Sequence, residues 1–180
     1  MSSTAESRIE QIKRHVQSFE NWPKNGIIFR DLFPVFREPK VLRVLIDELK
    51  EHITNAVKTV DVIVGIESRG FLFGPILALE LNLPFVPIRK KGKLPGSVNK
   101  VTYALEYGED TIEIQSESIK PGMNCVLIDD LLATGGTMNA AIKLISECNA
   151  SVKECLVVIE LVELDGRKNI PVAVHSLLQY

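Results

Sequence analysis

The sequence predicts an α/β protein in which a twisted, mostly parallel sheet carries helices on both faces. Two observations favour this class. Short runs rich in β-branched residues, typical of buried strands, alternate with longer runs of helical length. This alternation is expected where a helix connects each parallel strand to the next. The chain has 180 residues without repeats or linkers, so we predict one domain over residues 1–180.

The chain begins with a predicted surface helix. Ser3 and Glu6 have the spacing of a capping box, and the apolar residues that follow recur at helical intervals: Ile9, Ile12, Val16 and Phe19. A loop with Pro23 and Gly26 comes next. After Pro39, a longer amphipathic helix is predicted from the spacing of Leu42, Leu45, Leu49, Ile53 and Val57.

Strands and helices then alternate. The predicted strands are Val60–Ile66, Phe85–Arg89, Cys125–Asp129, Leu156–Leu161 and Val172–His175. The predicted helices are Phe71–Leu81 and Gly136–Glu147. The first of them is assigned in spite of Gly74 and Pro75. Val101–Leu105 and Thr111–Gln115 alternate in polarity like the two arms of a hairpin.

Composition excludes several classes of function. The formal net charge is −2, without the excess of Lys and Arg that bulk nucleic-acid binding needs. The N-terminus is polar and no apolar run approaches the roughly 20 residues of a membrane span, so we expect a cytoplasmic protein. The cysteines and histidines show no metal-binding spacing: Cys125, Cys148, Cys155, His15, His52 and His175.

Three unusual loops leave the carboxyl ends of predicted strands, which is where ligands bind in open α/β sheets. They are Glu67–Gly70, Lys90–Lys93 and Asp130–Thr137. Because the carboxyl ends of parallel strands lie at one edge of a sheet, we expect these loops to share one rim. The sequence therefore predicts a single ligand site built from all three.

The most informative segment is Val126–Thr137, in which a buried strand ends in two carboxylates and a helix begins at Thr-Gly-Gly-Thr. The glycines allow backbone N–H groups to approach a ligand closely, and a helix N-terminus favours negative charge. The segment is not a P-loop because no Gly-Lys-Ser/Thr follows. A phosphate cradle beside two acids suggests a ligand with phosphate and hydroxyl groups, such as a ribose phosphate. The alternative is an Asp-rich turn with ordinary helix capping.

The string Asp129–Thr137 resembles the 5-phosphoribosyl-1-diphosphate (PRPP) binding motif of the type I phosphoribosyltransferase family. Further segments are similar to the base-binding hood, diphosphate loop, basic stretch and mobile catalytic loop of that family: Gly26–Asp31, Gly65–Gly74, Ile88–Gly96 and Leu105–Gly108. The resemblance implies that family's fold, with an N-terminal hood over residues 1–36 and a flexible hairpin lid over about residues 94–115. It also implies transfer of phosphoribosyl from PRPP to a purine, and the Leu-Leu-Ala-Thr-Gly-Gly-Thr form favours adenine.

The resemblance also assigns the phosphate-bearing parts of the substrate. PRPP and AMP binding falls to Asp129, Asp130, Ala133, Thr134, Gly135, Gly136 and Thr137, with the two acids on the ribose hydroxyls. Diphosphate binding falls to Glu67, Ser68, Arg69, Arg89, Lys90 and Lys93. Arginine suits this role because its guanidinium binds phosphate oxygens in pairs. Two alternatives stay open: a tight turn with Arg69 in solvent, and a basic run that is only a solvated surface.

The predicted catalytic residues lie on the lid. Transfer requires a proton to leave the purine ring, and a closing lid excludes water, so a lid carboxylate suits acid–base chemistry. By resemblance we assign this role to Glu106, with Tyr107 beside it. Glu109 and Asp110 are rivals for the proton transfer, and a surface acid at a hairpin tip is the alternative.

The resemblance assigns adenine binding to Ile28, Phe29, Arg30 and Leu161. The apolar centre of the hood suits a flat purine. Main-chain groups of Ile28 and Arg30 would bind the base edge, while Leu161 packs on the other face of the ring. The alternative is a strand that caps the core with Phe29 buried.

The expected cofactor is Mg²⁺, carried mainly by the diphosphate and the sugar hydroxyls because Mg²⁺ prefers waters and substrate oxygens. The expected partners are PRPP and adenine, with no nucleic acid and no membrane. The resemblance alone implies a homodimer. Two other functions stay open: transfer to hypoxanthine, guanine, xanthine or orotate, and a non-catalytic module that senses a nucleotide in a retained PRPP pocket.

Overall fold

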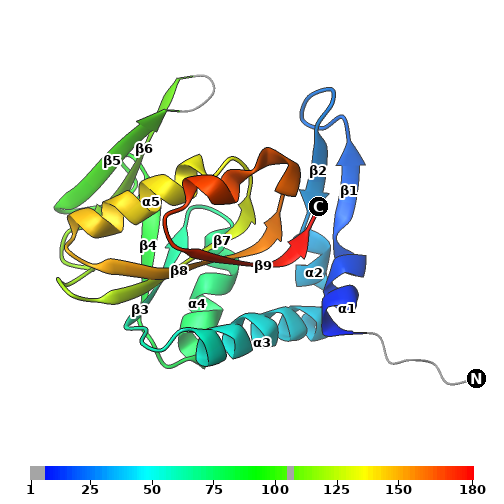
Figure 1. Ribbon diagram of the computed structural model, residues 1–180, viewed down its shortest axis with the longest axis horizontal. Helices are drawn as coiled ribbons and strands as arrows, with labels where there is room; N and C mark the ends of the chain where they lie inside the picture. Colours follow the sequence, from blue (N-terminus) through cyan, green and yellow to red (C-terminus); the bar gives the residue numbers. More distant parts are fainter. Residues whose placement is uncertain (1–6, 105–107) are drawn as a thin grey trace, which may run out of the picture. The chain divides into compact units, whose positions relative to one another are not determined.

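The structure, a computed structural model, describes residues 7–104 and 108–180 (Figure 1). The chain divides into two compact units, Met1–Glu51 and His52–Tyr180. The long helix α3 (Pro39–Ala56) begins in the first unit and ends in the second. A single domain over residues 1–180 stays a prediction. Among the described residues, no helix is both long enough and apolar enough to cross a membrane.

The first unit combines helices with a two-stranded hairpin. Its elements are α1 (Arg8–His15), β1 (Gln17–Glu20), β2 (Ile28–Asp31), α2 (Phe33–Arg37) and the first part of α3. The guanidinium of Arg8 ties α1 to α3 through Glu48 (Nε to Oε1, 2.5 Å) and Glu51 (Nη2 to Oε2, 2.6 Å). In the hairpin, the rings of Trp22 and Phe29 meet edge to face with centroids 4.4 Å apart. These contacts give the unit its own packing.

The first helix is shorter than the sequence predicts. It begins after Ser7, whose hydroxyl accepts a hydrogen bond from the Glu10 amide (3.2 Å). The prediction that Val16 and Phe19 continue the helix is wrong, because Val16 is already extended and Phe19 pairs with β2 inside β1. An apolar residue at helical spacing can equally serve a strand when a partner strand is present. The predicted capping box at residues 3–6 lies outside the described residues.

The second unit is built on a seven-stranded sheet with the order β5-β6-β4-β3-β7-β8-β9. Its strands are β3 (Val62–Ile66), β4 (Phe85–Lys90), β5 (Val98–Ala104), β6 (Glu109–Gln115), β7 (Asn124–Leu132), β8 (Ser151–Glu160) and β9 (Ala173–Gln179). Strands β4, β3, β7, β8 and β9 are parallel neighbours, and the antiparallel hairpin β5–β6 joins the sheet beside β4. The predicted class, a mostly parallel α/β sheet, is confirmed.

Helices cover both faces of this sheet. α4 (Gly70–Glu80) connects β3 to β4, and α5 (Gly136–Glu147) connects β7 to β8. These two connections leave the centre of the sheet in opposite directions, and right-handed crossovers then put their helices on opposite faces. Figure 1 shows α5 in front of the sheet and α4 behind it. Two short 3₁₀ helices, η1 (Val162–Leu164) and η2 (Gly166–Asn169), lie between β8 and β9.

Gly74 is compatible with α4 because the helix packs very close to β4. A Cβ at Gly74 would lie 2.5 Å from the ring of Phe85, and one at Gly65 in β3 would lie 2.7 Å from the same ring. The two glycines leave the space that Phe85 fills. This close packing offsets the poor helix propensity of glycine.

The central strands extend further than the sequence indicates. β7 continues beyond Asp129 because β8 runs alongside it, with Leu131 opposite Ile159 and Leu132 opposite Glu160. The two carboxylates therefore stand inside the strand and not in the loop that follows it. β8 ends at Glu160, so the predicted strand residue Leu161 lies just outside it. The sequence pattern of a buried strand fades where pocket residues begin, although the backbone pairing goes on.

Candidate active site

A pocket of about 370 Å³ opens at the carboxyl ends of β3, β4 and β7. It is lined by Glu67, Ser68, Arg69, Lys90, Asp129, Asp130, Leu131, Leu132, Ala133, Thr134, Gly135, Gly136, Thr137 and Met138. All three loops identified in the sequence contribute to this one cavity. Their convergence follows from the parallel sheet, whose strand ends share an edge.

The N-terminus of α5 forms one wall of the pocket. Gly135 precedes the helix with φ of +84°, a backbone conformation that glycine adopts without steric cost. The first amides of a helix have no acceptor within it, and the helix dipole places partial positive charge there. Gly135 has no side chain with which to cap these amides, so an anion in the pocket can accept hydrogen bonds from them. This wall suits a phosphate group.

The adjacent acids of β7 form the floor. Asp130 is buried, with 5% of its surface exposed, and its Oδ2 pairs with Nε of Arg69 at 2.8 Å. The Asp130 amide donates to Oδ1 of Asp129 (2.8 Å). Burial, and then the neighbouring Asp130 carboxylate, raise the pKa of Asp129 well above its usual value. Burial also raises the pKa of Asp130, an effect that the Arg69 guanidinium opposes.

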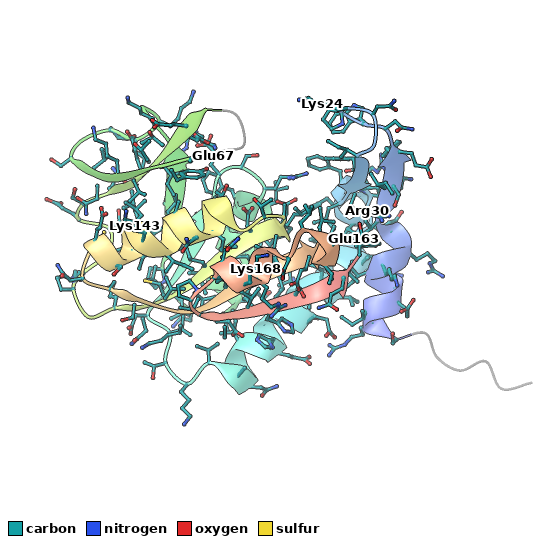
Figure 2. All side chains as sticks on the ribbon, turned by 45° about the horizontal axis from the view of Figure 1, so that its top comes forward. Lys24, Arg30, Glu67, Lys143, Glu163 and Lys168 are labelled. Atoms are coloured by element: carbon teal, nitrogen blue, oxygen red, sulfur yellow. The ribbon has the colours of Figure 1, made fainter. Side chains whose placement is uncertain are left out.

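Glu67, labelled in Figure 2, organises the opposite wall. Arg89 donates to both of its carboxylate oxygens, Nε to Oε2 (3.1 Å) and Nη2 to Oε1 (3.0 Å). The Lys90 amide donates to Oε2 as well (2.9 Å). The Arg89 hydrogen bonds lower the pKa of Glu67, so this carboxylate stays ionised. Arg89 is not among the residues that line the pocket, and its guanidinium instead holds Glu67 and the carbonyl of Lys93 (3.2 Å).

Lys90 connects the pocket to the β5–β6 hairpin. Its ammonium pairs with Oδ2 of Asp110 on β6. The Tyr103 hydroxyl of β5 donates to the same Asp110 oxygen (3.2 Å) and lies 3.2 Å from the hydroxyl of Thr137. A chain of polar contacts thus runs from the basic wall, across the hairpin, to the first turn of α5.

Several predicted site residues lie elsewhere or outside the description. Lys93 is exposed and does not line the pocket. Leu161 follows β8, and its amide donates to the Leu132 carbonyl (2.9 Å). Ile28–Arg30 belong to β2 in the first unit. The catalytic assignments Glu106 and Tyr107 fall outside the described residues. The roles assigned to all these residues stay predictions.

Two residues that were not predicted from the sequence contact the phosphate-binding loop. A Cβ at Gly166 would lie 2.0 Å from the Ala133 carbonyl oxygen. The side-chain amide of Asn169 donates to the Thr134 carbonyl (3.0 Å). Both belong to η2, a segment without a recognisable motif, and the only signal in the sequence is a Gly between polar residues. Contacts about 30 residues apart along the chain carry no local pattern.

The groups that line the pocket indicate which kind of ligand it binds. One wall offers helix amides and hydroxyls to a phosphate ester, the floor offers carboxylates to hydroxyl groups, and the other side offers Arg69 and Lys90 to further anionic groups. A sugar phosphate with a second anionic substituent matches all three. The fold and the pocket together define a protein that binds a phosphorylated sugar at the edge of a parallel sheet.

A family model described as a phosphoribosyl transferase domain matches residues 35–174. This chain belongs to the phosphoribosyltransferase family. The match covers the whole pocket lining, and the resemblance stated from the sequence motifs is confirmed.

Within the family, the chain is similar to adenine phosphoribosyltransferases. The enzyme of Drosophila pseudoobscura pseudoobscura is 49% identical over 177 residues, 98% of each chain. The solved structure from Saccharomyces cerevisiae, complexed with an imino-altritol bisphosphate and adenine, has a TM-score of 0.93 at 44% identity and covers 95% of this chain and 98% of that one. The enzyme from Trypanosoma brucei, in complex with AMP, pyrophosphate and ribose-5-phosphate, has a TM-score of 0.87 at 29% identity, covering 99% and 82%.

Proposed function

We propose that this protein transfers 5-phosphoribosyl from PRPP to adenine, giving AMP and diphosphate in purine salvage. The observation that carries the proposal is the pocket in which the Asp129–Asp130 pair adjoins the N-terminus of α5. The Drosophila and yeast relatives described above are adenine phosphoribosyltransferases, and this chain matches each of them over nearly its full length. The yeast enzyme binds adenine together with a bisphosphate, the two kinds of ligand that the reaction requires.

The reaction is a displacement at the anomeric carbon of PRPP. Adenine N9 forms a bond to C1′, the bond from C1′ to the diphosphate oxygen breaks, and the N9 proton leaves. Asp129 and Asp130 hold the ribose hydroxyls, while the Ala133–Thr137 loop and the first amides of α5 hold the 5′-phosphate. Arg69 and Lys90 stabilise negative charge as it moves onto the departing diphosphate.

The other assignments rest on resemblance. Glu106, with Tyr107, handles the proton of adenine, and closure of the lid keeps water from the positively charged sugar centre. Ile28–Arg30 and Leu161 bind the base. Glu67 acts mainly by accepting hydrogen bonds from Arg89 and the Lys90 amide, which maintains the geometry of the diphosphate-binding wall of the pocket.

Mg²⁺ is the proposed metal, and it supplies positive charge to the diphosphate and the sugar oxygens when bound. The oxygen donors of Asp129 and Asp130 fit it, since Mg²⁺ is held by one or two carboxylates together with substrate oxygens and water. We also propose a cytoplasmic homodimer, on the resemblance to the family. Light scattering on the purified protein tests the dimer directly: the mass should be twice the 20.1 kDa of one chain.

The proposed reaction is tested by incubating purified protein with PRPP, Mg²⁺ and adenine and measuring both products. AMP and diphosphate should appear in equal amounts, and excess chelator should stop their formation. Diphosphate without AMP would mean hydrolysis of PRPP, and the proposal of transfer would then be rejected.

A further inference from the structure

We propose that η2, the segment Gly166–Asn169, is a buttress that positions the phosphate-binding loop, with Asn169 and Gly166 as positioning residues for PRPP. The inference rests on the proposed function, because it names what holds the 5′-phosphate site in its binding geometry. Neither residue lines the pocket, so both act through the loop and not on the substrate.

The backbones of the loop and the buttress are in direct contact. A Cβ at Gly166 would lie 2.0 Å from the Ala133 carbonyl oxygen and 2.9 Å from the Gly135 nitrogen. In the other direction, a Cβ at Gly135 would lie 2.6 Å from the Gly166 carbonyl oxygen. Side chains at these positions would force the two segments apart. The close contact between the two segments therefore requires glycine at both positions.

Asn169 adds an orientation to this contact. Its side-chain amide donates to the Thr134 carbonyl at 3.0 Å. Because C=O and N–H of one planar peptide unit point in opposite directions, fixing the Thr134 carbonyl also fixes the direction of the Gly135 N–H. Gly135 lies in the pocket lining, directly before α5. Asn169 thus sets the peptide plane at the entrance to the phosphate-binding amides.

The buttress is itself anchored to the sheet. Arg167 makes two hydrogen bonds to the carboxylate of Glu160 at the end of β8, Nε to Oε1 (2.9 Å) and Nη2 to Oε2 (2.5 Å). Its Nη1 donates to the Val174 carbonyl of β9 (2.5 Å). The segment that contacts the loop is therefore tied through Arg167 to two neighbouring strands, β8 and β9, which gives it the rigidity that a positioning element needs.

The same segment provides a matched control. Lys168, labelled in Figure 2, pairs with Asp165 and is 64% exposed. It precedes Asn169 in η2, and its ammonium pairs with Asp165 and not with the loop. Replacing Lys168 changes the charge and composition of η2 without touching the contact that the proposal depends on.

The experiment measures ribose 5-phosphate binding by calorimetry in the full chain, for wild type, N169A, N169D and K168A. Loss of one orienting hydrogen bond should weaken binding by about five- to tenfold in N169A. The loss should be larger in N169D, which keeps the shape but replaces the donor by a carboxylate that repels the Thr134 carbonyl oxygen and the phosphate. K168A should bind within about twofold of wild type. In turnover assays, the KM for PRPP should rise by a similar factor in N169A while the KM for adenine and kcat change little.

Two results would overturn the proposal. One is wild-type binding of ribose 5-phosphate by N169A and N169D; the other is a fall in kcat and in adenine affinity equal to the loss for PRPP, which would indicate general disruption. G166A should show a larger loss than N169A, and if G166A does not fold, the asparagine variants still decide. If wild-type protein binds ribose 5-phosphate but does not convert adenine, the proposed function fails while the binding comparison continues to test the buttress.

Discussion

Two buried acids at the ends of neighbouring strands show how similar residues take different roles. Asp130 on β7 and Glu160 on β8 are each 5% exposed, and each pairs with an arginine, Arg69 and Arg167. Glu160 is fully engaged: Arg167 takes both oxygens, and Ser176 and Gln179 donate to Oε2. The Arg167 hydrogen bonds lower the pKa of Glu160 to about 2.

Asp130 is in the opposite electrostatic situation. It lines an open pocket, sits beside the second carboxylate of Asp129, and its pKa is raised by burial in spite of Arg69. A buried acid whose pKa is lowered by its partners stabilises the fold, whereas a buried acid beside a second carboxylate at a pocket is suited to a ligand. The opposite pKa shifts distinguish Asp130, a ligand-binding group, from Glu160, a structural group, without reference to any sequence motif.

The contrast predicts its largest effect for D130N. Removing the charge should lower kcat/KM for PRPP by at least about a hundredfold, because contacts between a charged group and substrate hydroxyls are lost together with the partner of Arg69. Thermal stability should stay close to wild type. Steady-state kinetics test the expected loss of kcat/KM, and a melting curve tests the expected thermal stability. Wild-type turnover in D130N would remove Asp130 from the site.

E160Q should lose stability and keep its kcat. The pKa of Glu160 is lowered from 4.5 to about 2, which corresponds to about 3 kcal/mol, discounted to roughly 2 kcal/mol because the Arg167 side chain is 44% exposed. Urea unfolding should report that loss, while kcat of the folded protein stays within about twofold. A variant with unchanged stability and lost turnover would invert the assigned roles.

The pKa values of Asp129 and Glu160 are shifted in opposite directions, so acidification should weaken PRPP binding at a higher pH than it removes the stability contributed by Glu160. The raised pKa of Asp129 means that it gains its proton early on acidification, so PRPP binding should weaken by up to about tenfold per pH unit, from a midpoint above the usual aspartate value of about 4. The stability contributed by Glu160 is complete above about 4.5 and is lost only as the pH falls towards about 2. Subtracting the profile of D129N isolates the first transition. A midpoint at or below 4 would contradict it.

The smallest effect is expected for D110N. Asp110 holds the Lys90 ammonium, which the proposed function assigns to the diphosphate. Without this competitor Lys90 should bind diphosphate slightly better, and product inhibition by diphosphate should set in at about threefold lower concentration. T102A, which alters an exposed hydroxyl pair on the same hairpin, is the control. Weaker inhibition in D110N would show that Asp110 positions Lys90 instead of competing for it.

The sequence predicted the parts of the molecule that rest on local chemistry. β3 is buried along its whole length and reads as β-branched apolar residues, and α5 begins and ends at the predicted residues, Gly136 and Glu147. Gly135 could be recognised because glycines at the start of a predicted helix let backbone N–H groups approach an anionic ligand closely. The residues of the Asp129–Thr137 motif line the pocket, so the position of this part of the site could be predicted from the sequence.

The parts that could not be predicted depend on contacts between distant segments. Phe19 has helical spacing but lies in a strand because β2 is available to pair with it. β7 continues to Leu132 because β8 accompanies it. Asn169 belongs to no recognisable sequence motif, and its proposed role depends on its hydrogen bond to the Thr134 carbonyl, 35 positions earlier in the chain. In each case the outcome depends on a contact with a segment that lies far away in the sequence, and no local pattern indicates that contact.

The most direct test of the central claim is diphosphate release from PRPP and Mg²⁺ by the purified protein, with adenine, hypoxanthine, guanine, xanthine and orotate offered in turn. Rapid release with adenine alone, accompanied by AMP, is the predicted result. Release with another base would keep the phosphate site and contradict the assignment of adenine. No release with any base, despite measurable PRPP binding, would contradict the enzymatic function itself.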